Sequence, residues 1–224
     1  MNALAKLAAA AIGAVTLTGC LPLTPTPEAA RHPGTMVVYH GLGTTAAEFT
    51  ATEPYASLID GLEAQGWDVI VPAYPSEAVG DAMAANILAA DPAALRDAWV
   101  NQYDHLALHG PVYLLGISWG GLVATNIATH ANHTPDGLVL HLPALDPNYL
   151  TEFATVDMSA LTDLAGFHGT AYVSWATDDT RVGYSTAAAM AGVWGATTRE
   201  YVTLGHTTND AVVADLLAYT KGLA

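Results

Sequence analysis

The sequence Gly-Ile-Ser-Trp-Gly at residues 116–120 places a serine inside a G-x-S-x-G pattern. An apolar run at 111–117 leads into it and a helical stretch follows, so the pattern predicts a tight turn between a strand and a helix. Such a turn makes a serine hydroxyl project from the edge of a sheet, and small flanking residues let strand and helix approach closely. Ser118 is therefore a candidate nucleophile supported by Gly116 and Gly120, although a glycine-rich turn with an incidental serine gives the same pattern.

In this strand–turn–helix context the chain resembles the α/β-hydrolase fold over nearly all of residues 35–224. The resemblance implies an α/β architecture in which a six-stranded, mostly parallel sheet is covered by helices on both faces. The family usually inserts a cap between the fourth strand and the acid loop. Here only residues 143–168 are available, so we expect a minimal cap and an open site.

The loop His-Gly-Leu-Gly at residues 40–43 directly follows the first apolar run and extends the resemblance. In the family, a loop that contains His-Gly at this place supplies a backbone N–H to the oxyanion hole. The match implies that the N–H groups of Leu42 and Trp119 bind the oxyanion, and that His40 and Gly41 shape the loop. Two fixed donors aimed at developing charge lower the barrier by several kcal/mol. The Trp119 side chain is expected either to line the pocket or to pack at the start of the helix.

A nucleophilic serine needs a base, and nine histidines are available. The family order is serine, acid, histidine, which selects His206 because it follows the last predicted strand and precedes the last helix. His105 and His109 are four residues apart, but they have no glutamate between them and no third ligand, so no metal site is predicted. His141 lies inside a predicted strand and is expected to be a hydrogen-bonded core or edge residue.

The acid is expected where the fifth predicted strand ends, in Trp-Ala-Thr-Asp-Asp-Thr-Arg-Val at residues 175–182. This segment resembles the family pattern G-x-x-D-x-x-V with Ala176 in place of glycine, and the count selects Asp179. Asp178 is then a turn or capping residue. Asp146 is a second alternative, because some family members carry the acid one strand earlier.

These residues predict a serine hydrolase that cleaves carboxylic esters through a Ser118–His206–Asp179 triad and an acyl-enzyme, with no metal and no cofactor. The expected substrate is a small or polymeric ester. Three alternatives stay open. An acyltransferase or a cofactor-free perhydrolase uses the same triad, an α/β-hydrolase peptidase cleaves amides, and a non-catalytic surface lipoprotein keeps the fold without the chemistry.

The elements that must position these residues follow from alternating short apolar runs and amphipathic stretches. Such alternation predicts a mostly parallel sheet covered on both faces. The expected strands are 35–39, 67–72, 111–117, 137–142, 171–175 and 199–204. The expected helices are 55–66, 92–106, 120–130, 185–193 and 209–219, and Asp91 before Pro92 is typical of a helix N-cap.

The only cysteine, Cys20, closes Leu-Thr-Gly-Cys at residues 17–20, which resembles the bacterial lipobox. Lys6 and a short apolar stretch precede it, as in a secretory signal. We therefore expect a signal peptide over 1–19, lipid attachment at Cys20, and a Pro/Thr-rich tether over 20–34. The folded domain then spans 35–224 of an exported protein that the lipid anchors to a bacterial membrane. An ordinary signal peptide with an incidental cysteine makes the protein periplasmic or secreted instead.

Composition excludes other classes of function. The chain has 224 residues, 6 of them Lys or Arg and 21 Asp or Glu, which gives a formal charge of −15. Nucleic-acid binding needs clustered cations, so it is not expected. The same charge disfavours anionic polymers and anionic lipid surfaces as substrates. A single cysteine excludes a disulfide framework.

Overall fold

A six-stranded, fully parallel sheet forms the centre of the protein. The computed structural model describes residues 33–75, 77, 80–150, 153, 157–162 and 164–224, so the predicted signal peptide, Cys20 and most of the tether lie outside the described residues. The strand order is β2-β1-β3-β4-β5-β6, and every neighbouring pair is parallel. The strands are β1 (Thr35–Tyr39), β2 (Asp68–Ile70), β3 (Val112–Ile117), β4 (Gly137–His141), β5 (Thr170–Ala176) and β6 (Thr197–Tyr201).

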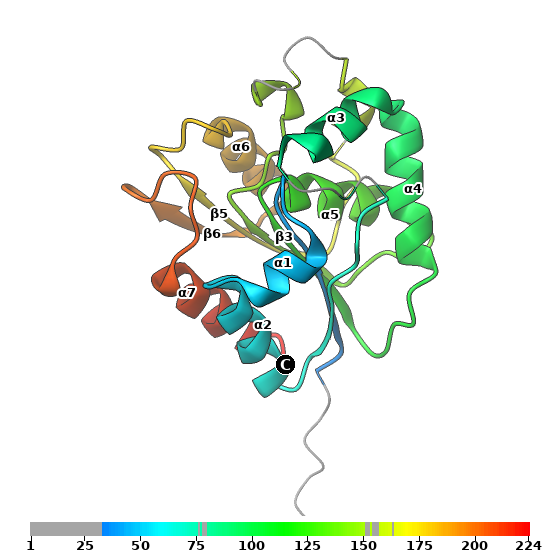
Figure 1. Ribbon diagram of the computed structural model, residues 1–224. Coiled ribbons are helices and arrows are strands. Elements are labelled where there is room, and N and C mark those ends of the chain that lie inside the picture. The colour runs from blue at the N-terminus through cyan, green and yellow to red at the C-terminus, as the bar shows by residue number, and fades with distance from the viewer. Residues whose placement is uncertain (1–32, 76, 78–79, 151–152, 154–156, 163) are drawn as a thin grey trace, which may run out of the picture. The chain divides into compact units, whose positions relative to one another are not determined.

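Seven α-helices in the described part of the chain cover this sheet on both faces (Figure 1). They are α1 (Ala46–Ala51), α2 (Tyr55–Ala64), α3 (Asp81–Ala89), α4 (Pro92–Asp104), α5 (Trp119–His130), α6 (Tyr184–Trp194) and α7 (Asp210–Lys221). Buried side chains of α1, α2 and α7 pack on one face, and those of α3, α4, α5 and α6 pack on the other. This is the architecture that the sequence predicts.

The strands carry continuous apolar runs because both of their faces are buried. Leu114 and Leu115 are adjacent in β3, have no solvent exposure, and belong to opposite hydrophobic layers. The helices begin where capping groups satisfy their first N–H groups. Asp91 accepts the N–H of Ala94 at the start of α4, as predicted, and Asn209 accepts the N–H of Val212 at the start of α7.

The segment between β4 and β5 does not form a separate domain in its described residues. Its described residues include the short 3-10 helices η1 (Pro147–Tyr149) and η3 (Ser159–Leu161). Seven of its described apolar side chains are buried in the same hydrophobic layer as α4 and α5: Leu145, Leu150, Phe153, Met158, Leu161, Leu164 and Phe167.

Four details differ from the sequence-based expectations. The second strand is Asp68–Ile70 and not 67–72. The sixth strand is Thr197–Tyr201 and not 199–204, because the backbone leaves the sheet after Tyr201. The N–H groups of Leu204 and Gly205 bind Asp178 there instead of a neighbouring strand. Helices α1 and α3 were not expected, since the first is only six residues long and the second is rich in alanine.

Candidate active site

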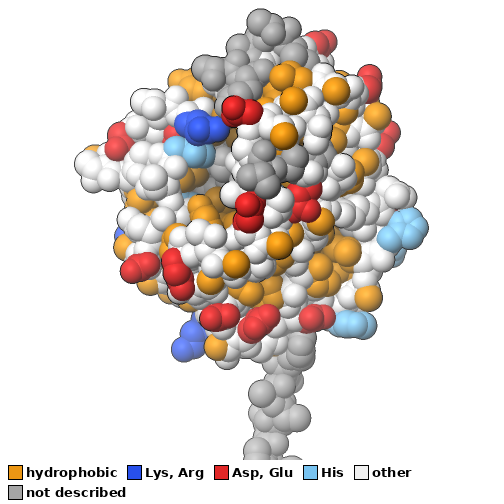
Figure 2. Space-filling model, in the orientation of Figure 1, with side chains coloured by type: hydrophobic (Ala, Val, Ile, Leu, Met, Phe, Trp, Pro, Cys, Tyr) orange, Lys and Arg blue, Asp and Glu red, His pale blue; other side chains and the backbone are white. Residues whose placement is uncertain are grey.

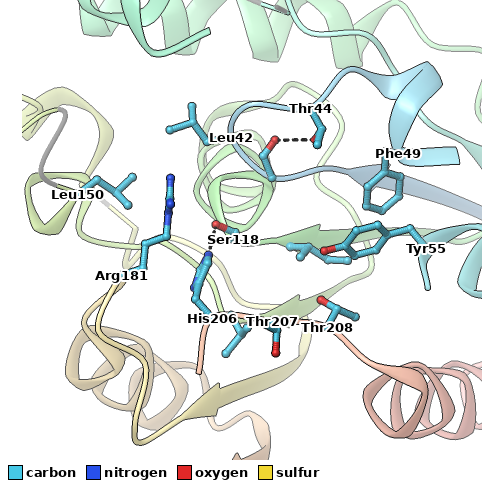
Figure 3. Close-up of a pocket in the computed structure, with 13 residues that line it drawn as sticks. Leu42, Thr44, Phe49, Tyr55, Ser118, Leu150, Arg181, His206, Thr207 and Thr208 are labelled. Atoms are coloured by element: carbon cyan, nitrogen blue, oxygen red, sulfur yellow. Dashed lines mark hydrogen bonds between the residues drawn. The ribbon is translucent and has the colours of Figure 1, made fainter. Parts of the chain in front are cut away.

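The loops at the carboxyl ends of five strands enclose a cavity of about 260 Å³. This is the edge at which ligands bind in open parallel sheets. Gly41 and Leu42 follow β1, Ser118 follows β3, Leu142 follows β4, Arg181 follows β5, and His206 follows β6. Thr44, Phe49, Tyr55, Ile117, Leu150, Thr207 and Thr208 complete the lining, and Figure 3 shows most of these side chains around Ser118.

Ser118 lies in the sharp turn between β3 and α5 with φ 54° and ψ −119°, a left-handed conformation that a serine rarely adopts. The two flanking glycines permit this turn by close approach. A Cβ on Gly116 would lie 2.5 Å from the Gly120 carbonyl oxygen, and one on Gly120 would lie 1.9 Å from the Tyr39 carbonyl oxygen. With the strand and helix in these positions, neither residue can therefore be larger than glycine.

A chain of hydrogen bonds links Ser118 to an acid through a histidine. The Oγ of Ser118 lies 2.8 Å from Nε2 of His206, and Nδ1 of His206 lies 2.7 Å from Oδ2 of Asp179. A carboxylate only accepts, so Nδ1 carries the proton and Nε2 is left to accept from the serine hydroxyl. This tautomer is the one that can take a proton from Ser118.

The carboxylate of Asp179 is almost completely buried and held by several donors. Its Oδ1 accepts the N–H groups of Arg181 at 2.8 Å and Val182 at 3.1 Å. Burial raises the pKa of Asp179, but the hydrogen bonds from His206 and these two N–H groups outweigh burial and lower the pKa below its ordinary value. Asp179 is therefore ionised at neutral pH.

The two alternative acids, Asp178 and Asp146, bind backbone N–H groups and not His206. Oδ1 of Asp178 accepts the N–H groups of Leu204 and Gly205 and so holds the loop that carries His206. Asp146 caps η1 by accepting the N–H of Asn148 at 3.1 Å. None of these three hydrogen bonds involves the ring of His206.

The loop after β1 brings Leu42 to the cavity wall opposite His206 (Figure 3). His40 has no exposed surface, and its Nδ1 lies 3.0 Å from the Gly41 carbonyl and 3.3 Å from Oγ1 of Thr44. Burial lowers the pKa of His40, against the opposing effects of the Gly41 carbonyl and Glu77, so the ring is neutral at pH 7. The hydroxyl of Tyr74 donates to the His40 carbonyl at 2.6 Å. These contacts fix the backbone on both sides of Gly41.

Trp119 is the first residue of α5, so its N–H has no acceptor within the helix and points out of the helix start next to Ser118. Its side chain has no exposed surface and packs against Trp99 and Phe153, with ring centroids 5.9 and 5.2 Å away. Of the two expectations for this side chain, packing at the helix start is confirmed.

Comparison with known proteins agrees with this architecture. The model of the alpha/beta hydrolase family matches residues 36–221. This chain belongs to the alpha/beta hydrolase family. No curated protein matches the sequence.

Solved structures share the fold of this alpha/beta hydrolase at low sequence identity. Monoacylglycerol lipase from Paleococcus ferrophilus is 14% identical, with a TM-score of 0.60, and the match covers 86% of this chain and 96% of the lipase. Est1E from Butyrivibrio proteoclasticus is 13% identical, with a TM-score of 0.61, covering 84% and 87%. Mouse alpha/beta hydrolase domain-containing protein 10 is 12% identical, with a TM-score of 0.63, covering 84% and 88%.

Several residues of the site were not singled out by the sequence. Arg181 and Leu150 line the cavity, and Glu77 lies with its Oε1 3.5 Å from Nε2 of His40 while it also accepts the N–H of Ala46. No motif marks Glu77. Arg181 is two residues after Asp179 and follows β5, so its position in the sequence could have predicted that it lies near the site. Within the described part of the chain, no group of three or more His, Cys, Asp or Glu is arranged to hold a metal ion.

Proposed function

We propose that this alpha/beta hydrolase is a serine hydrolase that cleaves carboxylic esters. The observation that carries the proposal is the continuous hydrogen-bonded line from Ser118 through His206 to Asp179 at the cavity wall. The line combines a nucleophile, a base in the required tautomer and an ionised acid.

The geometry supports a two-step reaction. Oγ of Ser118 attacks the ester carbonyl while Nε2 of His206 takes its proton, and Asp179 stabilises the imidazolium that forms. The N–H groups of Leu42 and Trp119 bind the oxyanion of the tetrahedral intermediate. His206 then protonates the leaving alcohol, and water attacks the acyl-enzyme with the same histidine as base.

We further propose that the site accepts long or polymeric esters as well as short ones. The described residues between β4 and β5 pack into the core, so in this proposal they do not act as a lid. A cavity of about 260 Å³ holds the reacting end of the ester, and the remainder extends over the surface.

The test is a panel of esters from short acyl chains to triglyceride, run on the wild type and on Ser118→Ala. We expect hydrolysis by the wild type across the panel and its loss in the variant. A sharp drop above butyrate contradicts the open-site proposal. Product analysis with an alcohol or peroxide present distinguishes hydrolysis from acyl transfer or perhydrolysis.

We also propose that the protein is exported and anchored through a lipid on Cys20. The lipobox-like sequence at residues 17–20 and the preceding apolar stretch support this. None of the described helices has both the length and the apolar composition needed to cross a bilayer. Labelled palmitate supplied to a bacterial host should be incorporated into the wild type and not into Cys20→Ala, and labelling of both or neither contradicts the anchor.

A further inference from the structure

His141 is a buried histidine between the two halves of the catalytic site. It is the last residue of β4, pairs with Ile117 on one side and Ser174 on the other, and has no exposed surface. Its backbone carbonyl accepts the N–H of Ser118 at 3.0 Å. The strand that holds the nucleophile is thus bonded directly to this residue.

The ring of His141 reaches the loop that carries the base. Its Nε2 lies 3.4 Å from the carbonyl oxygen of Thr207, the residue after His206, and its Nδ1 lies 2.9 Å from Oγ of Ser174. The ring of Tyr201 packs edge-on at a centroid distance of 6.1 Å. One residue therefore contacts both the serine turn and the histidine loop.

The partners of the ring select one neutral tautomer. A carbonyl oxygen only accepts, so the contact with Thr207 requires a proton on Nε2. The hydroxyl of Ser174 has one proton and two acceptors in reach, Nδ1 of His141 at 2.9 Å and the Leu140 carbonyl at 3.2 Å. In this tautomer it donates to Nδ1, the nearer of the two. Burial lowers the pKa of His141 to about 4; nearby His206 acts in the same direction, while the Thr207 carbonyl and Asp179 oppose it. The ring is therefore neutral at pH 7 and adds no second cation beside the imidazolium of His206.

We propose that His141 is a positioning residue that fixes the loop of His206 against the turn of Ser118. This inference rests on the proposed function. The critical contact in this proposal is the hydrogen bond from Nε2–H of His141 to the Thr207 carbonyl. Loss of this bond would let the His206 loop shift, and a misplacement of the base by about 1 Å can reduce the rate on the order of 100-fold.

Two substitutions separate this role from general support of the core. His141→Gln keeps an amide donor near the position of Nε2, whereas His141→Asn reaches only to the position of Nδ1. We expect His141→Gln to retain most of kcat. His141→Asn should lose on the order of 10- to 100-fold in kcat, with little change in KM and a parallel fall in the rate of fluorophosphonate labelling. Equal losses in both variants, or no loss in either, overturn the proposal.

A measurement on the wild type keeps the proposal testable if either variant fails to fold. Nitrogen-15 NMR of the histidine rings reports the tautomer of His141. A proton on Nε2 supports the proposal, and a proton on Nδ1 overturns it. This readout does not depend on turnover, so failure of the proposed esterase activity is seen separately, as wild-type protein that cleaves no ester in the panel.

A second inference comes from the charge of the cavity. Its lining residues include Arg181 and no Asp or Glu, in a chain whose formal charge is −15. The Arg181 side chain extends along the cavity beside Ser118 and next to Leu150 (Figure 3). Its backbone is held in place because Oδ1 of Asp179 accepts its N–H.

We infer that, besides neutral esters, the site takes esters bearing one carboxylate, which Arg181 binds. This deepens the proposed function. A guanidinium has five donors in a planar fork that matches a carboxylate, so it can keep a protein partner and still bind substrate.

The test compares methyl butyrate with monomethyl succinate, in which a carboxylate replaces the terminal methyl group. We expect Arg181→Gln to lower the ratio of kcat/KM for the anionic over the neutral ester on the order of 10-fold or more. Arg199→Gln, which removes the same charge from β6 outside the cavity, should leave the ratio unchanged. An unchanged ratio in Arg181→Gln overturns the inference.

A binding measurement makes the second test independent of turnover. Calorimetry on Ser118→Ala should show monomethyl succinate binding that is lost in Ser118→Ala/Arg181→Gln. No binding, or equal binding to both, overturns the inference about Arg181. Failure of wild-type protein to cleave either ester contradicts the proposed function instead.

Discussion

The adjacent residues Asp178 and Asp179 have different roles in positioning His206. Asp179 holds the ring of His206, while Asp178 holds the backbone that leads to it. The sequence pattern favours Asp179 by its spacing to Ala176 and Val182, and the geometry brings the same residue to the histidine. The sequence also predicts Asp178 as a turn or capping residue, but it does not say which N–H groups Asp178 binds, because backbone donors carry no residue-type signal.

Asparagine substitutions of the two aspartates should therefore differ sharply. Asp179→Asn removes the acceptor that fixes the tautomer of His206, so we expect kcat for ester hydrolysis to fall roughly 10³- to 10⁴-fold. Asp178→Asn keeps an oxygen for the two N–H groups, and activity should stay within a few-fold of wild type. Steady-state kinetics of both variants checks this. Similar losses would contradict the assignment of the acid.

The buried His141 should make stability depend on pH. Its pKa is lowered to about 4 in the folded protein, against about 6.5 when unfolded, so the unfolded chain binds the proton first as pH falls. The free energy of unfolding should therefore fall progressively as the pH is lowered from about 6.5 to about 4. The total loss that this histidine causes is about 3 kcal/mol.

Urea unfolding of the wild type and His141→Gln at several pH values measures this. The free energy of unfolding of the wild type, relative to that of His141→Gln, should fall as the pH is lowered from 7 to 4. A difference that is constant over this range contradicts a neutral buried ring.

At the scale of elements, helices with clear apolar periodicity were predicted, whereas helices α1 and α3 were not. Helices α2, α4 and α7 follow from apolar spacing, and Asp91 and Asn209 cap the last two. Helix α1 carries a capping box from Thr45 to Glu48, a signal that the apolar spacing alone does not contain. Helix α3 has few distinguishing side chains, and its burial of Met83 and Ile87 depends on tertiary packing. The end of β6 depends on Asp178, which is distant in sequence.

The packing of α5 against β1 predicts a specific steric effect. Gly120→Ala would place a Cβ 1.9 Å from the Tyr39 carbonyl oxygen and 2.7 Å from that of His40. Because both contacts are backbone, the helix must move and take Ser118 with it. We expect activity to fall on the order of 100-fold and the melting temperature to fall.

Gly192→Ala in α6 is the matched control. A Cβ there meets no atom within 4 Å, and alanine is the better helix former, so stability should hold or rise by up to about 1 kcal/mol. Unchanged activity and melting temperature in Gly120→Ala would contradict the close approach of α5 and β1.

At the scale of the molecule, the two hydrophobic layers share one sheet and should unfold together. Leu114→Ala and Leu115→Ala each remove a fully buried side chain, one from each layer. Each should lower the free energy of unfolding by about 2–5 kcal/mol and shift a single common transition. Circular dichroism and tryptophan fluorescence measured together check this. Two separate transitions in either variant would contradict one cooperative unit.

Net charge also acts at this scale. The face in Figure 2 carries scattered acidic side chains and few Lys or Arg. An overall charge of −15 opposes binding of polyanions, yet one cation in the cavity can bind a single carboxylate. Composition predicts the first property, whereas the second is an inference from the fold, which brings Arg181 to the cavity.

The central claim is that Ser118 is an activated nucleophile. Reaction with a fluorophosphonate followed by mass spectrometry tests it most directly. The wild type should be labelled on Ser118, labelling should be lost in Ser118→Ala, and His206→Ala should react far more slowly. Wild-type protein that stays unlabelled, or is labelled on another residue, would contradict the account and favour a binding protein that has kept the fold.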